Sequence, residues 1–197
     1  MLIIADGGMV NCNVPDTMDA ILLTKNNGFV DGVKLDVRMT NDNFLVLCKD
    51  DDLSKNTLAK GMVSKSNLDY IKKVKFPSHV FKYFIPTLQD ILEKYDKGKI
   101  VVLELYQQNN NLLYCKKIFE LLSHYPYKYI FLIDDKMENA ITNAKLNLLG
   151  DIKLKKDVLF IDNSLNKLDN IKEDSIIITT NPMKINNYFK NRQKMSK

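Results

Sequence analysis

Hydrophobic and polar residues divide the chain into short apolar runs separated by amphipathic stretches. Continuous apolar runs of this length are typical of strands buried on both faces of a parallel sheet. The runs are Leu2 to Ala5, Ile100 to Tyr106, Tyr129 to Asp134, Val158 to Asn163 and Ser175 to Pro182. The amphipathic stretches predict helices at residues 17–27, from Pro86 onward, and at 112–124, 137–149 and 165–171. Strands that alternate with helices predict an α/β fold with a parallel sheet, followed by a polar tail.

The stretch from Asp31 to Leu53 has a different pattern. Two apolar runs flank the polar turn Asn41 to Asn43, which predicts two strands joined by a tight turn. Lys34, Asp36 and Arg38 alternate along the first strand and therefore share one of its faces. Charges on an apolar strand are costly unless they pair, bind an ion or contact water. This face is the first indication of a functional site.

Composition narrows the class of protein. A chain of 197 residues with 45% hydrophobic content is long enough for one domain with a sizeable core. The net charge of +5 is best explained by solubility, and weak attraction to anionic lipid or phosphate is an alternative. No clustered basic face with aromatics indicates nucleic-acid binding. Three isolated cysteines fit a reducing compartment. We find no signal peptide and no apolar run of about 18 residues that would span a membrane, and we expect a cytoplasmic protein.

Several motifs, in order along the chain, resemble those of the glycerophosphodiester phosphodiesterase (GDPD) family. That family has a Glu-x-Asp-Val strand end, then Thr-x-Asp-Gly, then a strand that ends in His-Asp-x-x-Leu. The matching residues here are Asp36, Val37, Thr40, Asp42, Asp50 and Leu53. Ile85-Pro86-Thr87-Leu88 matches the family's Ile-Pro-Thr-Leu helix entry, and Glu104 matches a glutamate in an apolar strand.

The resemblance implies a (β/α)8 barrel of the TIM type in a single domain over residues 1–197. It also implies a family-type insertion at about residues 50–84. Such barrels usually need about 250 residues. We therefore expect a shortened or irregular barrel, with one or two βα units missing between about residues 135 and 157.

The resemblance also implies a chemistry. Relatives cleave glycerophosphodiesters with two histidines as general acid and base, and with calcium or magnesium held by two glutamates and one aspartate. The histidine positions correspond to Asp6 and Lys49, and the ligand positions to Lys34, Asp36 and Glu104. Lys34, Lys49 and Asp50 are the expected substrate-binding residues. The two histidines of this chain, His79 and His124, lie in a linker and at a helix end, away from these positions.

These replacements lead to the hypothesis of a metal-free charge cluster, with Lys34 and Lys49 against Asp6, Asp36 and Glu104. It predicts a catalytically impaired pseudoenzyme that needs no cofactor. One alternative is an active phosphodiesterase in which Lys34 turns outward, Asp6, Asp36 and Glu104 hold calcium or magnesium, and Lys49 serves as acid or phosphate clamp. A second alternative is a protein that binds a glycerophosphodiester-like or phosphate molecule, or that assembles as a homo-oligomer.

Overall fold

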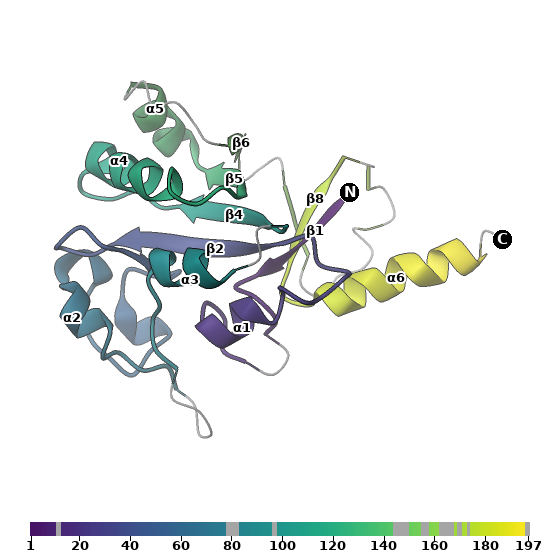
Figure 1. Cartoon of the computed structure of the whole chain (residues 1–197), viewed down its shortest axis with the longest axis horizontal. Coiled ribbons are helices and arrows are strands. Elements are labelled where there is room, and N and C mark those ends of the chain that lie inside the picture. Colours follow the sequence, from purple (N-terminus) through teal and green to yellow (C-terminus); the bar gives the residue numbers. More distant parts are fainter. Residues whose placement is uncertain are drawn as a thin grey trace.

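The computed structural model describes residues 1–10, 13–77, 83–95, 98–143, 150–154, 158–161, 168, 171–172 and 174–195. Its strands form one twisted sheet, which Figure 1 shows with helices on both sides. The strands are β1 (Leu2–Asp6), β2 (Gly32–Met39), β3 (Leu45–Leu47), β4 (Ile100–Leu105), β5 (Lys128–Ile133), β6 (Gly150–Leu154), β7 (Leu159–Phe160) and β8 (Ile176–Thr179). The helices are α1 (Met18–Leu22), α2 (Leu68–Ile71), α3 (Leu88–Lys94), α4 (Asn111–Leu122), α5 (Asp135–Asn143) and α6 (Pro182–Met195), with two 3₁₀ turns, η1 (Leu53–Lys55) and η2 (Val63–Lys65).

The sheet has the strand order of a TIM-type barrel that is incomplete. Its order is β6-β5-β4-β2-β1-β8-β7, with every neighbouring pair parallel, while β3 pairs antiparallel with β2. Within the described part of the chain, β6 and β7 are the two outer strands and do not pair with each other. The expected shortened α/β barrel is therefore confirmed, with seven parallel strands in the described residues.

The two faces of β2 meet different surroundings, as strand alternation requires. Val33, Leu35 and Val37 belong to the larger core, which also contains residues of α3 and α4 such as Leu88 and Ile118. The opposite face belongs to the inside of the barrel. A smaller apolar cluster lies on that inner side, formed by Ile4, Ile100, Val102, Ile130, Leu132, Val158, Ile176 and Ile178.

The connection from β3 to α3 (residues 48–87) has a core of its own. Val46, Leu53, Val63, Ile71 and Phe76 are buried together beneath it. Figure 1 shows this connection, with α2, below β2, on the side opposite to α4 and α5. Because the connection follows the hairpin at the end of β2, it lies beside the carboxyl ends of the parallel strands.

Local signals account for most helix boundaries. Thr87 caps α3 in a capping box, because its side chain accepts from the Asp90 amide while the Asp90 carboxylate accepts from the Thr87 amide. Gly8 precedes α1 at φ +97°, and a Cβ there would lie 2.4 Å from the Ala20 carbonyl, so only glycine allows α1 to pack this closely.

Three expectations about elements need correction. Helix α1 ends at Leu22 and not near Asn27, because the chain continues in i→i+3 turns and the Thr24 hydroxyl binds the Ile21 carbonyl. The expected polar tail is helix α6, whose Ile185, with Tyr188 and Phe189, packs against an apolar cluster that includes Ile3. Residues 150–154, which we did not predict as a strand, form β6.

Other expectations fall on residues outside the described part. These are the helix at 165–171, apart from residues 168 and 171, and the end of the helix expected at 137–149, of which α5 covers Asp135–Asn143. His79 also lies outside the described residues. His124 is exposed just beyond the end of α4, beside a surface hollow.

Candidate functional site

Strand register brings four charged residues together at the mouth of the barrel. Asp6 on β1 pairs in register with Lys34 on β2, and Asp36 on β2 pairs with Glu104 on β4. Neighbouring residues of a parallel sheet that are in register point to the same face. All four side chains therefore face the inside of the barrel near its carboxyl end, where barrel active sites are built.

Lys34 is the centre of this group, which we call the mouth cluster (Asp6, Lys34, Asp36 and Glu104). Its Nζ atom lies 2.7 Å from Asp6 Oδ1, 2.9 Å from Asp36 Oδ2 and 3.0 Å from Glu104 Oε2. The Lys34 side chain is 1% exposed. An ammonium group buried at this depth is stable only because three carboxylates replace its lost hydration.

The electrostatics of Lys34 follow from these contacts. Burial alone would lower the pKa of the Lys34 ammonium. The carboxylates of Asp36, Asp6 and Glu104 outweigh that effect and hold its pKa above its ordinary value. Lys34 is therefore a fixed positive charge at every physiological pH and not a proton shuttle.

Tyr106 contacts the mouth cluster, and Arg38 contacts Tyr106. The Tyr106 hydroxyl donates to Asp36 Oδ1, and burial beside Asp36 raises the pKa of this phenol. The Arg38 guanidinium lies 4.4 Å from the centre of the Tyr106 ring. Arg38 also donates to the Lys49 carbonyl at 2.8 and 3.1 Å. Arg38 was expected on this face of β2, but its contact with Tyr106 was not.

The structure separates Lys49 and Asp50 from the mouth cluster. The Lys49 side chain is exposed, and in the described part of the chain it forms no salt bridge. Asp50 binds Lys55 at 3.1 Å and Asn56 at 2.7 Å instead. Burial would raise the pKa of Asp50, but the hydrogen bonds from Lys55 and Asn56 lower it. The Lys34 part of the expected charge cluster is present, whereas Lys49 forms no salt bridge with its carboxylates in the described residues, and its place in the cluster stays a prediction.

A pocket of about 270 Å³ opens beside the cluster at the mouth of the barrel. Asp6 and Asp36 form part of its wall, Lys49 and Asn56 stand on the side of the β3–α3 connection, and Thr180 follows the end of β8. We call this space the mouth pocket. Of the six residues expected in the site, Asp6, Asp36 and Lys49 line this pocket.

Asp16 is a residue of the mouth pocket whose importance the sequence did not reveal. It was expected only as a helix cap, but Thr17 caps α1 and Asp16 is buried in the pocket wall at φ +60°. Its Oδ1 atom is buried without a hydrogen-bond partner among the described residues. Burial, and then the charge of Asp36, raises the pKa of Asp16 well above its usual range. In the sequence, only its place in a Pro-Asp-Thr helix entry could have pointed to Asp16 as a site residue.

The same positions do not suit a divalent cation in this arrangement. Calcium and magnesium need several oxygen ligands turned toward the ion. Here each carboxylate of the mouth cluster contacts the Lys34 ammonium, which would repel such an ion. Within the described residues, no group of three or more His, Cys, Asp or Glu side chains is placed to hold a metal. The assignment of Asp6 and Lys49 to the family's catalytic positions, and of Asp36 and Glu104 to its ligand positions, stays a prediction.

The fold and the site define the class: a TIM-type α/β barrel with its charged residues at the carboxyl end of the strands. The comparisons with known proteins identify the family. The model of the glycerophosphoryl diester phosphodiesterase family matches residues 13–125. The chain therefore belongs to the GDPD family.

Individual relatives share less than 30% of their residues with this chain. A glycerophosphodiester phosphodiesterase from Caldanaerobacter subterraneus is 28% identical over 141 residues, which are 68% of this chain and 57% of that protein. The chain thus matches little more than half of the relative's length. An Oleispira antarctica phosphodiesterase, solved in complex with the product sn-glycerol-3-phosphate, has a TM-score of 0.71 at 19% identity, over 95% of this chain and 89% of the other. A glycerophosphodiester phosphodiesterase from Agrobacterium tumefaciens has a TM-score of 0.63 at 17% identity, over 92% and 97%.

Proposed function

We propose that this GDPD-family protein is a catalytically impaired pseudoenzyme in which the Lys34 ammonium takes the place of a divalent cation. The observation that carries the proposal is the position of Lys34 Nζ, within 3.0 Å of carboxylate oxygens of Asp6, Asp36 and Glu104. An ammonium group can neutralise these carboxylates, but it cannot coordinate a phosphoryl oxygen and polarise it as a metal ion does. The cluster then preserves the shape of the barrel mouth without the family's chemistry.

The properties of Lys34 and the position of His124 support the same proposal. General acid and base catalysis near neutral pH needs a group whose pKa lies near the working pH. The pKa of Lys34 is raised above its ordinary value, so Lys34 keeps its proton near neutral pH. Lys49 is exposed and forms no salt bridge among the described residues. His124 lies at the end of α4, beside a different surface hollow.

The alternative of an active phosphodiesterase requires Lys34 to turn outward and free the carboxylates. Its burial and its three ion pairs count against that arrangement, because breaking a buried ion pair costs about 3–5 kcal/mol. We keep this alternative as the outcome that would overturn the proposal.

Hydrolysis assays test the proposal directly. Glycerophosphocholine and bis(p-nitrophenyl) phosphate are incubated with the protein, with and without calcium, magnesium or manganese, beside the Asp36→Ala variant. We expect no turnover above background under any condition. Metal-dependent turnover that the Asp36→Ala substitution abolishes would overturn the pseudoenzyme proposal and favour the active alternative.

A second experiment tests the role of Lys34 without relying on activity. Lys34→Glu restores the residue type that the family has at this position and places a fourth carboxylate beside Asp6, Asp36 and Glu104. We expect calcium or magnesium to raise the melting temperature of this variant, because an ion that binds only the folded state stabilises it by about 2.7 kcal/mol at 100 times its Kd. The unmodified protein should show no rise. A rise in the unmodified protein would contradict the proposal.

A ligand-binding role at the mouth pocket is a second candidate function. It is supported by the pocket of about 270 Å³ and by the unpartnered Oδ1 of Asp16 in its wall. A relative binds sn-glycerol-3-phosphate, so we propose titrating this compound by calorimetry. Binding that Asp16→Ala and Lys49→Ala both weaken would support this role, and no heat of binding would count against it.

A further inference from the structure

One segment of the chain near the barrel mouth is rich in lysine. Residues 53–77, which we call the basic segment, contain six lysines and one aspartate, so the segment carries a net charge of +5. The whole chain also has a net charge of +5, and residues 182–197 are a second basic stretch with five basic and no acidic residues. The lysines are Lys55, Lys60, Lys65, Lys72, Lys73 and Lys75.

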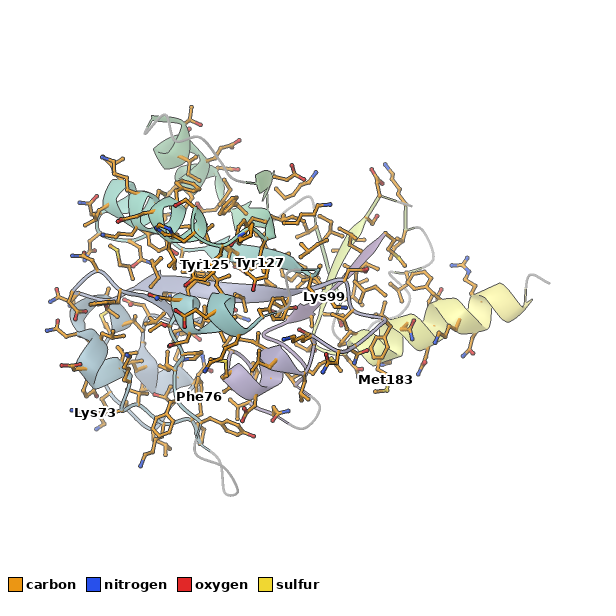
Figure 2. All side chains as sticks on the ribbon, viewed as in Figure 1. Lys73, Phe76, Lys99, Tyr125, Tyr127 and Met183 are labelled. Atoms are coloured by element: carbon orange, nitrogen blue, oxygen red, sulfur yellow. The ribbon has the colours of Figure 1, made fainter. Side chains whose placement is uncertain are left out.

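These lysines are directed to solvent and have few ionic partners. All six are exposed. Within the described part of the chain only Lys55 forms a salt bridge, with Asp50. Figure 2 shows Lys73 at the outer edge of the molecule, away from the strands of the sheet. Asp69 lies within the segment and Asp50, Asp51 and Asp52 come directly before it, so these carboxylates offset part of the charge, and the exposed lysines still outnumber them.

Apolar side chains are exposed among the same lysines. Leu58 is 71% exposed, Tyr70 45% and Met62 38%. Backbone contacts place them beside the lysines, because the Leu58 amide donates to the Lys75 carbonyl at 2.9 Å and the Tyr70 hydroxyl donates to the Lys60 carbonyl at 2.9 Å. A shallow hollow joins the two sets and is lined by Leu58, Ala59, Tyr70, Lys73, Val74 and Lys75.

We propose that the basic segment is a docking surface for an anionic lipid bilayer. Lysines near such a bilayer gain electrostatic attraction to its headgroups, and exposed aliphatic and aromatic side chains gain by entering the interfacial region. A nucleic acid would attract the same lysines but would give exposed Leu58 and Met62 no apolar environment. The combination of both kinds of side chain on one surface therefore favours lipid.

The position of the segment gives this docking a consequence for the barrel. Asn56 and Phe76, which lie next to Lys55 and Lys75 in the sequence, line the mouth pocket. A bilayer held by the basic segment would therefore lie beside the mouth of the barrel. This inference is independent of the proposed loss of catalysis, because it involves none of the residues of the mouth cluster.

Vesicle co-sedimentation tests the proposal. The whole protein is mixed with vesicles of phosphatidylcholine alone, and with vesicles of phosphatidylcholine and phosphatidylglycerol in equal parts. We expect binding to the anionic vesicles only, and weaker binding as salt is added. Reversing three charges with Lys60→Glu, Lys73→Glu and Lys75→Glu should weaken binding by at least about 100-fold. Leu58→Ser should weaken it by about 10-fold while leaving the charge unchanged.

The matched control reverses three exposed lysines elsewhere, with Lys116→Glu, Lys128→Glu and Lys136→Glu. It has the same net charge as the first triple variant, so unchanged vesicle binding would show that position matters. Circular dichroism and melting temperature confirm that each variant folds. Equal loss in both triple variants, no binding to anionic vesicles, or binding to duplex DNA but not to vesicles would each overturn the proposal.

Discussion

Lysine has two opposite environments in this molecule, the mouth cluster and the basic segment. Lys34 is 1% exposed and contacts three carboxylates. The lysines of the basic segment are exposed, and only Lys55 of them has a carboxylate partner in the described residues. The difference teaches that a lysine contributes to folding stability where it is buried and paired with carboxylates. An exposed, unpaired lysine instead contributes to the charge of the surface. Substitutions in the two regions should therefore have very different consequences.

The largest expected effect comes from breaking the mouth cluster. Lys34→Met keeps a similar volume but leaves Asp6, Asp36 and Glu104 without their cation. The free energy of unfolding should fall by about 3–5 kcal/mol, because uncompensated charges remain buried. Lys73→Met in the basic segment is the matched control and should change it by less than about 0.5 kcal/mol. Urea unfolding measures the change in both variants. Equal losses of stability would contradict the contrast between the mouth cluster and the basic segment.

A smaller loss of stability is expected when the aspartates that hydrogen-bond to the basic segment are replaced. Asp51 accepts from the Ser64 amide at 2.8 Å and from the Ser64 hydroxyl at 2.7 Å, which ties the end of the hairpin to η2. Asp51→Ala should cost about 1–3 kcal/mol, because it leaves the two partly buried Ser64 donors without their acceptor. Asp52, which caps η1 in an exposed position, is the control, and Asp52→Ala should cost about 0.5–1 kcal/mol. Hydrogen exchange of the amides from Val63 to Ser66 should increase mainly in the Asp51 variant.

The smallest expected effect is an increase in stability, and it comes from a substitution of Asp16. Because the folded protein holds the pKa of Asp16 above its unfolded value, the contribution of Asp16 to stability is present at acidic pH and is lost as pH rises through the folded pKa. Asp16→Asn should therefore raise the free energy of unfolding by about 1 kcal/mol at neutral pH and by less at acidic pH. Melting curves between about pH 5 and pH 8 test this. A gain that grows toward acidic pH would contradict it.

Much of the architecture could be predicted from the sequence, for identifiable reasons. The apolar runs at Leu2, Ile100 and Tyr129 form parallel strands because they are hydrophobic on both faces. The alternation of Lys34 and Asp36 in an apolar strand pointed correctly to the inner face of β2. The resemblance then supplied the barrel and the expectation that Lys34 would meet Asp36 and Glu104.

The failures occurred where tertiary contacts decide the outcome. Strand β6 contains polar residues that alternate with apolar ones, and it is an edge strand, so no continuous apolar run marked it. Helix α6 has an apolar stripe, Ile185 with Tyr188 and Phe189, that we overlooked in a polar surrounding. Lys49 could not be placed from the sequence, because its backbone carbonyl accepts from Arg38 and its side chain is left in solvent.

The burial of Lys34 also means that the counter-ion of the barrel mouth is covalently part of the chain. A bound calcium or magnesium ion has a dissociation constant, so chelators and changes in ion concentration can empty its site. The Lys34 ammonium is covalently attached and cannot diffuse away, so it separates from its carboxylates only if its side chain turns outward or the protein unfolds. We therefore expect the mouth of this barrel to keep its shape in EDTA and across the ionic conditions of any cell.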